Sequence, residues 1–372
     1  MRGALPGSPF MTAKGRRGGG DLLRDKTAEF QDALLRWFAR HRRDLPWRRT
    51  ATPYRVWISE ILLQQTRVRT ALPYFERFLK RFPNVRRLAR ASEPEVLELW
   101  AGLGYYARAR NIRRAAGMIV SHHRGRFPTT MGDLLALPGI GRYTAGAILS
   151  IAFNQPVPIV DGNVRRLISR LHGIKRRRNG EYFWRQAAAW IPPGRASQFN
   201  QAVMELGALV CLPSGPLCPR CPVSGFCVAR SRGIADRIPP PRSKRAAQPV
   251  RFALMVAECN GCILVSTRHP ADFVPGEWGL PASEICSAGE AHPAANALAR
   301  GALGVRVLTR EEGTVGHAIT YRRIRAQVFR AIVKGKSRLP QPRAGYHWVS
   351  RSEAERLLTS SLYRKALRAL SG

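Results

Sequence analysis

The chain has 372 residues, enough for two or three domains, and 45% of them are apolar, which is sufficient for a hydrophobic core. Its 62 Lys and Arg residues outnumber 24 Asp and Glu residues, so the formal net charge is +38. This excess favours a polyanionic partner such as nucleic acid, although a merely solvated basic surface is the alternative. No apolar run approaches the roughly 20 residues that span a bilayer, so we expect no membrane segment.

The N-terminal residues and the cysteines indicate where in the cell the protein works. Residues 1–25 have basic residues and glycines but no long apolar stretch, which predicts a disordered basic tail rather than a secretory signal. Seven cysteines, four of them tightly clustered, favour a metal site in a reducing compartment over disulfides. We therefore expect a cytoplasmic protein.

From Thr27 to about Arg230 the hydrophobic pattern is helical, with no convincing strand alternation. Within it, Tyr54–Thr66 predicts a helix on which Glu60 follows Val56 and Trp57 by four and three residues and so joins an apolar stripe. A carboxyl group there loses hydration, which raises its pKa and favours a neutral acid. The alternative is a structural carboxylate paired with an arginine such as Arg67.

A glycine-rich turn follows between two helical segments. Its residues Pro138, Gly139 and Gly141 allow a tight turn and a close approach of the backbone to a ligand. The N–H groups at the start of the next helix suit a phosphate, which would position a nucleic acid without reading its sequence. An ordinary interhelical turn is the alternative.

Asp161 is the second carboxyl group of interest, and it precedes a helix that starts near Asn163. The helical N–H groups would keep it ionised. Breaking a base–sugar bond requires protonation of the departing base and stabilisation of the cationic sugar, and two carboxyl groups can divide these tasks. Asp161 as a plain helix N-cap is the alternative.

The clustered cysteines have the spacing C-x6-C-x2-C-x5-C and are Cys211, Cys218, Cys221 and Cys227. Four thiolates can saturate a tetrahedral zinc ion or a cubane iron–sulfur cluster. Zinc ribbons usually carry two C-x2-C pairs, and this cluster has one. The spacing therefore favours an iron–sulfur cluster, with structural zinc as the alternative.

Residues 231–249 change in character, because Pro239–Pro241 lies among arginines and lysines and predicts an extended basic linker. Beyond it, residues 250–372 predict a small α/β domain. The expected elements are strands at Arg251–Val256 and Gly261–Ser266 joined at the turn Asn260-Gly261, a helix at Ala291–Gly304 and a strand at Ala326–Val333.

Several segments together resemble one family. These segments are Ser59–Thr66, Gly102–Asn111, Leu137–Ala147, Val160–Val164 and the cysteine cluster. Their order and spacing resemble those of bacterial adenine DNA glycosylases in the endonuclease III superfamily, closely so from about Leu45 to Arg230. The resemblance implies a mostly α catalytic region followed by a small α/β Nudix-like domain. The implied parts are a six-helix barrel with a helix-hairpin-helix at 47–154, an iron–sulfur helical lobe at 26–46 and 155–230, and the Nudix-like domain at 250–372.

The resemblance also implies roles for single residues. Glu60 would protonate the adenine and Asp161 would stabilise the oxocarbenium ion. Tyr143 and Asn163 match residues that line the same pocket. Arg48 and Glu205 match residues that contact the flipped adenine. Gln64, Gln65 and Tyr106 match residues that contact the DNA, and Gln65 and Tyr106 would insert into the base stack as wedges.

By the same resemblance, the cysteines would hold a 4Fe-4S cluster, and the monomeric protein would act on duplex DNA that carries adenine opposite 8-oxoguanine or guanine. Relatives that also cut the strand carry a lysine where this chain has Tyr143, so we expect a monofunctional glycosylase. A thymine-mismatch glycosylase and a non-enzymatic iron–sulfur DNA-binding or redox module are the alternatives. Gln64, Gln65, Glu60 and the C-terminal domain argue against the first.

The Nudix-like domain departs from the family pattern in two places. Its expected helix lacks the paired glutamates that would bind magnesium at Ala295–Arg300, so we expect a reader of oxidised guanine and not a pyrophosphatase. The nearest match to the family's Phe-Ser-His loop is Val315-Gly316-His317, in which only His317 is retained. We therefore expect a reduced preference for oxidised over normal guanine.

Overall fold

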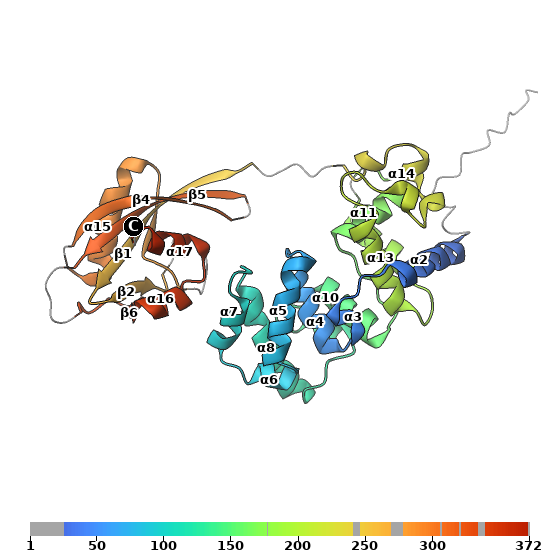
Figure 1. The fold of residues 1–372 in the computed structure, drawn as a ribbon, viewed down its shortest axis with the longest axis horizontal. Coiled ribbons are helices and arrows are strands. Elements are labelled where there is room, and N and C mark those ends of the chain that lie inside the picture. Colours follow the sequence, from blue (N-terminus) through green and yellow to red (C-terminus); the bar gives the residue numbers. More distant parts are fainter. Residues whose placement is uncertain are drawn as a thin grey trace, which may run out of the picture. The chain divides into compact units, whose positions relative to one another are not determined.

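The computed structural model describes residues 26–176, 178–240, 246–268, 278–305, 307–319, 321–333 and 339–370. The predicted tail at 1–25 and residues 241–245 of the predicted linker lie outside these ranges. The chain forms two compact units, Met1–Ala91 with Asn111–Arg242 and Ser92–Arg110 with Ser243–Gly372 (Figure 1). None of the helices in the described ranges has both the length and the apolar character needed to cross a membrane.

The N-terminal region is helical throughout its described part, as the sequence predicts. Its α-helices are α2 (Thr27–His41), α3 (Pro46–Arg49), α4 (Pro53–Leu63), α5 (Val68–Arg81), α6 (Val85–Ala89), α7 (Glu93–Trp100), α8 (Ala107–His123), α9 (Met131–Leu135), α10 (Arg142–Ala147), α11 (Gly162–Leu171), α12 (Gly180–Ala189), α13 (Ala196–Leu209) and α14 (Val228–Ser231). A π-helical turn, Ile148–Ala152, directly continues α10.

Helix α4 begins where its sequence dictates. Thr52 accepts a hydrogen bond from the Arg55 backbone N–H, and Pro53 occupies the first turn, where its missing N–H costs nothing. Nearly every later residue of α4 is buried, so the helix runs through the core rather than along its surface. A polar side chain on such a helix is desolvated wherever it points.

Helices α2, α11, α12 and α13 share one core cluster, in which Phe30 and Leu34 of α2 pack with Leu167 of α11 and Phe199 of α13. Segments more than a hundred residues apart in the sequence therefore form a single hydrophobic core, and α13 brings its own buried face to this core. This packing holds α11 and α13 in place relative to each other, and with them Asp161 at the start of α11 and Glu205 on α13.

The second unit contains a mixed sheet with strand order β4-β5-β1-β2-β6, and β3 also pairs with β1. The strands are β1 (Gln248–Cys259), β2 (Cys262–Ser266), β3 (Ala282–Ile285), β4 (Leu308–Ile319), β5 (Arg322–Ile332) and β6 (Tyr346–Ser350). Strands β1 and β5 are parallel and the other pairs are antiparallel. The predicted turn is present, with φ of 47° at Asn260 and 73° at Gly261.

Helices cover the sheet on both faces. On one face, α16 (Arg351–Leu357) and α17 (Ser361–Arg368) pack on Phe252, Leu254 and Val256 of β1. On the other face, α15 (Ala291–Leu303) packs on Met255 and Ala257 of the same strand. Successive side chains of β1 therefore pack alternately against α16 and α17 on one face and against α15 on the other.

The predicted strands were too short, because β1 extends to Gln248–Cys259 and β5 begins at Arg322 rather than Ala326. The first four residues of β5 include three arginines, which conceal the alternation of Ile324, Ala326 and Val328 on the buried face.

Candidate active site

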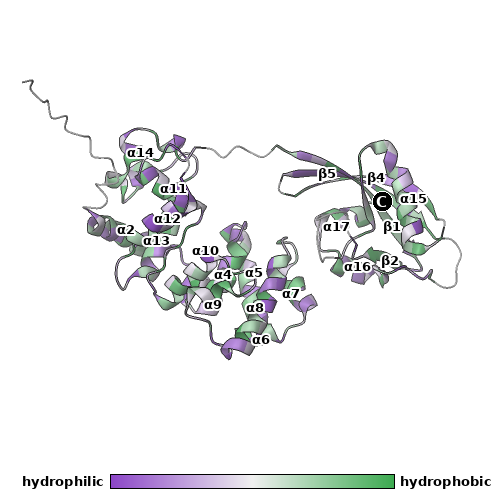
Figure 2. Cartoon of the chain, turned by 180° about the vertical axis from the view of Figure 1, so that it is seen from behind, coloured by the Kyte–Doolittle hydropathy of each residue, from purple (hydrophilic) through white to green (hydrophobic). Residues whose placement is uncertain are grey.

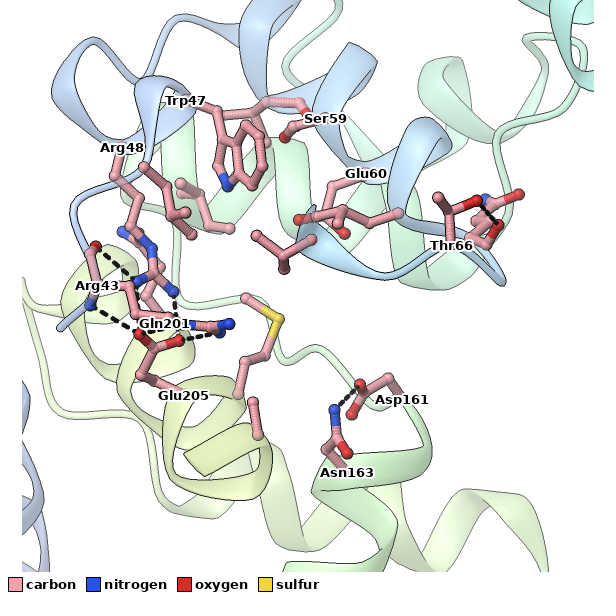
Figure 3. A pocket seen from close by; sticks show the side chains of 18 of the residues that line it. Arg43, Trp47, Arg48, Ser59, Glu60, Thr66, Asp161, Asn163, Gln201 and Glu205 are labelled. Carbon is pink, nitrogen blue, oxygen red and sulfur yellow. Dashed lines mark hydrogen bonds and ion pairs between the residues drawn. The ribbon is translucent and has the colours of Figure 1, made fainter. Parts of the chain in front are cut away.

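A cavity of about 580 Å³ lies in the first unit and holds both predicted carboxyl groups. Glu60 of α4 and Asp161, which caps α11, lie across it from one another (Figure 3). The cavity is also lined by six other residues that the sequence singled out: Arg48, Gln64, Gln65, Tyr143, Asn163 and Glu205. The structure therefore brings eight predicted residues from α3, α4, α10, α11 and α13 to one place.

Glu60 is 6% exposed. Its pKa is raised to about 7, chiefly by burial and also by the nearby Asp161 carboxylate, although a hydrogen bond from Tyr143 and the charge of Arg48 act in the opposite direction. The shift has the direction and the main cause that the apolar stripe predicts. A carboxyl group with this pKa carries a proton in a large share of molecules at neutral pH.

The Tyr143 hydroxyl lies 3.3 Å from the Met204 sulfur, to which it can donate a hydrogen bond, and it also lies within hydrogen-bonding reach of the Glu60 carboxyl group. Burial and the two neighbouring carboxylates raise the pKa of Tyr143 well above its ordinary value. The phenol therefore stays protonated, and carboxylate oxygen is the stronger acceptor of its hydrogen bond. Tyr143 acts as a fixed donor that stabilises the ionised form of Glu60.

Asp161 caps α11 and accepts a hydrogen bond of 2.7 Å from the Val164 backbone N–H. The Asn163 side-chain amide donates to its other oxygen over 3.0 Å. These bonds lower the pKa of Asp161, as expected at a helix N-terminus, but burial acts more strongly and raises the pKa overall. The predicted N–H donors are thus present, and the cost of burial outweighs them.

Glu205 of α13 is fully buried and is bound by two arginines. Arg43 donates from its backbone N–H and from two side-chain nitrogens at 2.6–3.0 Å, and Arg48 donates from two nitrogens at 2.9 Å each. Burial alone would raise the pKa of Glu205, but the hydrogen bonds from Arg43 and Arg48 lower it to about 2. Sequence reasoning missed Arg43, because its partner lies 162 residues away.

Of the two predicted wedge residues, only Gln65 has a geometry that suits this role. It lines the cavity and has φ of 59°, a conformation that non-glycine residues rarely adopt. Tyr106 is 5% exposed, and its hydroxyl accepts a hydrogen bond from the Gly102 N–H. Its neighbour Tyr105 is 49% exposed with φ of 52°, so the exposed aromatic ring is Tyr105 and not the predicted Tyr106.

The predicted helix-hairpin-helix is formed by α9, the turn with Pro138 and α10. Gly139 has φ of 77°, and a Cβ atom there would lie 2.9 Å from Asn111 Cβ, so this turn requires glycine. Gly141 is the N-cap of α10 and provides no side chain to cap it. The turn thus leaves its backbone open to close approach, as the sequence predicts.

The four clustered cysteines line one small pocket with apolar neighbours that include Leu171, Val210 and Val223. Burial raises the pKa of Cys221 to about 12, and the other three thiols add to the shift. In the described part of the chain, no three Cys, His, Asp or Glu side chains converge closely enough to hold a single metal ion. The structure thus gathers the four predicted thiol ligands around one pocket.

Two arginines of α11 connect this pocket to the cavity. Arg170 donates a hydrogen bond to the Cys211 sulfur over 3.2 Å. Arg166 donates to the Cys211 carbonyl oxygen over 2.7 Å and to the Asn163 side-chain oxygen over 2.8 Å. Sequence reasoning missed these contacts, because both arginines are two among the many basic residues of the chain.

His317 lies on β4 in the second unit. Its Nδ1 is 3.2 Å from the Ser361 hydroxyl of α17, and Lys365 of the same helix donates to the Gly316 carbonyl oxygen over 2.9 Å. Burial and the Lys365 charge lower the pKa of His317. The imidazole therefore faces α17 and is neutral at physiological pH.

Comparisons with known proteins find matches for both the helical region and the C-terminal region. Residues 58–193 match the family model of the HhH-GPD superfamily of base excision DNA repair proteins, and residues 252–369 match the NUDIX domain model. The chain is 42% identical over 249 residues to the adenine DNA glycosylase of Buchnera aphidicola subsp. Baizongia pistaciae, which covers 65% of this chain and 70% of that protein. It is 40% identical over 276 residues to the Homo sapiens adenine DNA glycosylase, with coverage of 70% and 50%.

Among solved structures, that of a thermostable thymine-DNA glycosylase has a TM-score of 0.54 and 28% sequence identity, and it covers 57% of this chain and 100% of that one. The chain spans about half the length of the first curated relatives it matches, between 49% and 59%.

Proposed function

Because the chain belongs to the adenine DNA glycosylase family, we propose that it is a monomeric DNA N-glycosylase that excises adenine from duplex DNA. The observation that carries this proposal is the single cavity shared by Glu60, whose pKa is about 7, and Asp161. Adenine opposite 8-oxoguanine or guanine is the proposed substrate.

The chemistry follows from the two carboxyl groups. Neutral Glu60 donates its proton to the flipped adenine, the C1′–N9 bond breaks, and its electron pair leaves with the base. Ionised Asp161 stabilises the positive charge on the sugar, and water adds to C1′ while its proton passes to the Glu60 carboxylate, which restores the acid. Glu205, Arg43 and Arg48 provide a charged, fixed wall for the base.

The proposal is tested with duplexes that carry adenine opposite 8-oxoguanine, guanine, cytosine or thymine, followed by alkali to reveal abasic sites. Adenine should be released opposite 8-oxoguanine and guanine, with a smaller difference between these two than in relatives with the complete Phe-Ser-His loop. Release of thymine from a T:G duplex in place of adenine would indicate the thymine-mismatch alternative. Duplex binding without release of any base would indicate the non-enzymatic one.

The pH dependence of adenine excision should follow the protonation state of the Glu60 carboxyl group. Its acid form is lost as the pH rises through about 7, so the single-turnover rate should fall over that range. Tyr143→Phe removes a hydrogen bond that lowers the pKa of Glu60, so the alkaline limb should move to higher pH. Rates measured from pH 5 to 9 on an adenine:8-oxoguanine duplex test this shift.

The matched control is Tyr182→Phe, because Tyr182 of α12 hydrogen-bonds His172 and does not line the cavity. Its pH profile should overlay that of the unmodified protein. An alkaline limb in Tyr143→Phe that stays in place or moves to lower pH contradicts the role given to Tyr143.

We further propose that the strand is left intact after base removal. A phenol cannot form the Schiff base that a lysine would form at position 143, so borohydride should trap little protein on the DNA. The positive control is a strand-cleaving relative of the same superfamily under identical conditions. A strong, stoichiometric covalent adduct would defeat this part of the proposal.

The cysteine pocket is proposed to hold a 4Fe-4S cluster through Cys211, Cys218, Cys221 and Cys227. When bound, such a cluster supplies a structural anchor and a redox-active centre. We expect about four irons and four acid-labile sulfides per chain, the stoichiometry of one cubane. Zinc in place of iron in protein purified without added metal would contradict the assignment.

A further inference from the structure

Three arginines lie together on one face of the second unit's sheet. In the parallel pairing of β1 with β5, Arg251 lies directly beside Arg325. Arg323 precedes Arg325 by two residues, so its side chain projects from the same face. All three are exposed, and we call this set the arginine face.

The arginine face continues the side of the sheet that α15 covers. Further along, this side carries Ala253 and Phe329, which pack on Ala291 and Ala295 of α15. Arg251 lies at the edge of this covered region and is exposed, although its partner on β3, Ile285, still packs on α15. Figure 1 shows the first part of β1 and of β5 extending past α15, and Figure 2 shows this end of β5 in hydrophilic colour.

The neighbouring strand keeps this end of the sheet open. Strand β4 contributes Gly316 opposite Arg325 and Ala318 opposite Arg323, and both are exposed. Because these side chains are absent or small, an extended ligand could approach the guanidinium groups closely. The next residue on β4, His317, projects to the other side, toward α17.

The charges of the arginine face are not neutralised within the described residues, where no carboxylate forms an ion pair with Arg251, Arg323 or Arg325. The carboxylate on the same side, Glu311, accepts a hydrogen bond from the Gln327 amide over 3.2 Å. Like charges placed directly opposite on paired strands destabilise a sheet. The fold gains nothing from Arg251 beside Arg325, whereas an anionic ligand would relieve their repulsion.

We propose that the arginine face is a docking surface for the sugar–phosphate backbone of duplex DNA. This inference rests on the proposed function and adds a phosphate contact to it. Guanidinium groups bind phosphate oxygens in a bidentate manner. The Cα atoms that carry them are about 5 Å apart between the strands and about 7 Å apart along β5. A flat row of cations suits a chain of phosphates and carries no means of reading bases.

The test uses the full-length protein with Arg251→Gln, Arg323→Gln and Arg325→Gln combined. Each phosphate contact contributes about 0.9 to the slope of log affinity against log salt, so the slope should fall by about 2 to 3. The matched control combines Arg300→Gln, Arg356→Gln and Arg368→Gln, three exposed arginines of the same unit, and removes the same charge. It should leave the slope close to that of the unmodified protein.

Several results would overturn the proposal. An unchanged salt slope would do so, as would an equal fall in the control, which would show that only net charge matters. A third is polyglutamate binding that depends on the three arginines while duplex binding does not, which would indicate an acidic protein partner. Unchanged thermal unfolding verifies that the variant folds.

Failure of this inference is distinguishable from failure of the proposed function. At saturating protein, the single-turnover rate of adenine release should be the same in the variant and in the unmodified protein, because the cavity is untouched. If duplex binding depends on the arginine face but no base is released, the docking surface stands and the enzymatic proposal fails.

Discussion

Replacing Glu60 with Gln is expected to lower the single-turnover rate of adenine release by roughly 10²- to 10⁴-fold, the usual contribution of a general acid. The amide has the size of the carboxyl group but cannot donate a proton to the departing base. Because Glu60 is neutral in much of the protein at pH 7, the substitution should leave the cavity intact. The Kd for an adenine:8-oxoguanine duplex should therefore change little.

The matched control is Glu76→Gln, at an exposed position on α5, which should leave both rate and affinity unchanged. Loss of affinity together with rate in Glu60→Gln would indicate that Glu60 serves the structure. Retention of the full rate would exclude it as the acid.

Replacing Glu205 with Gln is expected to lower the free energy of unfolding at pH 7 by about 3–5 kcal/mol, as when one partner of a buried ion pair is removed. The amide would leave the guanidinium groups of Arg43 and Arg48 without their counter-charge. Arg48 has 13% and Arg43 has 34% of its side chain exposed, so water can replace the lost contacts only in part. Denaturant unfolding of both proteins measures the difference.

The same substitution has a defined pH dependence. The pKa of Glu205 is about 2 in the folded state and about 4.3 in an unfolded chain. A lowered folded-state pKa stabilises the protein fully above the unfolded value, and the contribution disappears as the pH falls toward 2. The difference between the two proteins should therefore shrink between pH 5 and pH 2, and a constant difference would contradict the ion-pair assignment. Glu76→Gln is again the control, with a change within about 0.5 kcal/mol.

The parts of the site that sequence reasoning predicted are those with local signals. Glu60 is recognisable because its apolar neighbours lie one helical turn away, and Asp161 because it precedes a helix. The helical region, the glycine turn and the Asn260-Gly261 hairpin have the same local character. Such features depend on residues within a few positions of each other.

The missed parts depend on residues that are distant in the sequence. The contact of Arg43 with Glu205 arises only when α13 packs beside the segment before α3. The sequence does not reveal which of Tyr105 and Tyr106 is exposed. In the structure Tyr105 has a positive φ and an exposed ring, whereas Tyr106 is buried. Arginines at the start of β5 conceal a strand, because alternation is judged from apolar residues alone.

Helix α11 begins next to Asp161, and near its other end Arg170 contacts Cys211 of the cysteine cluster. Asp161 and Arg170 are nine residues apart, a span of roughly 13 Å along the axis. One helix thus has Asp161 as its N-cap and contacts the cysteine cluster near its last turn. Under the proposed function, damage to the cysteine cluster is therefore expected to misalign Asp161, so that oxidation of the cysteines should lower the rate of adenine release while the Glu60 and Asp161 side chains remain intact.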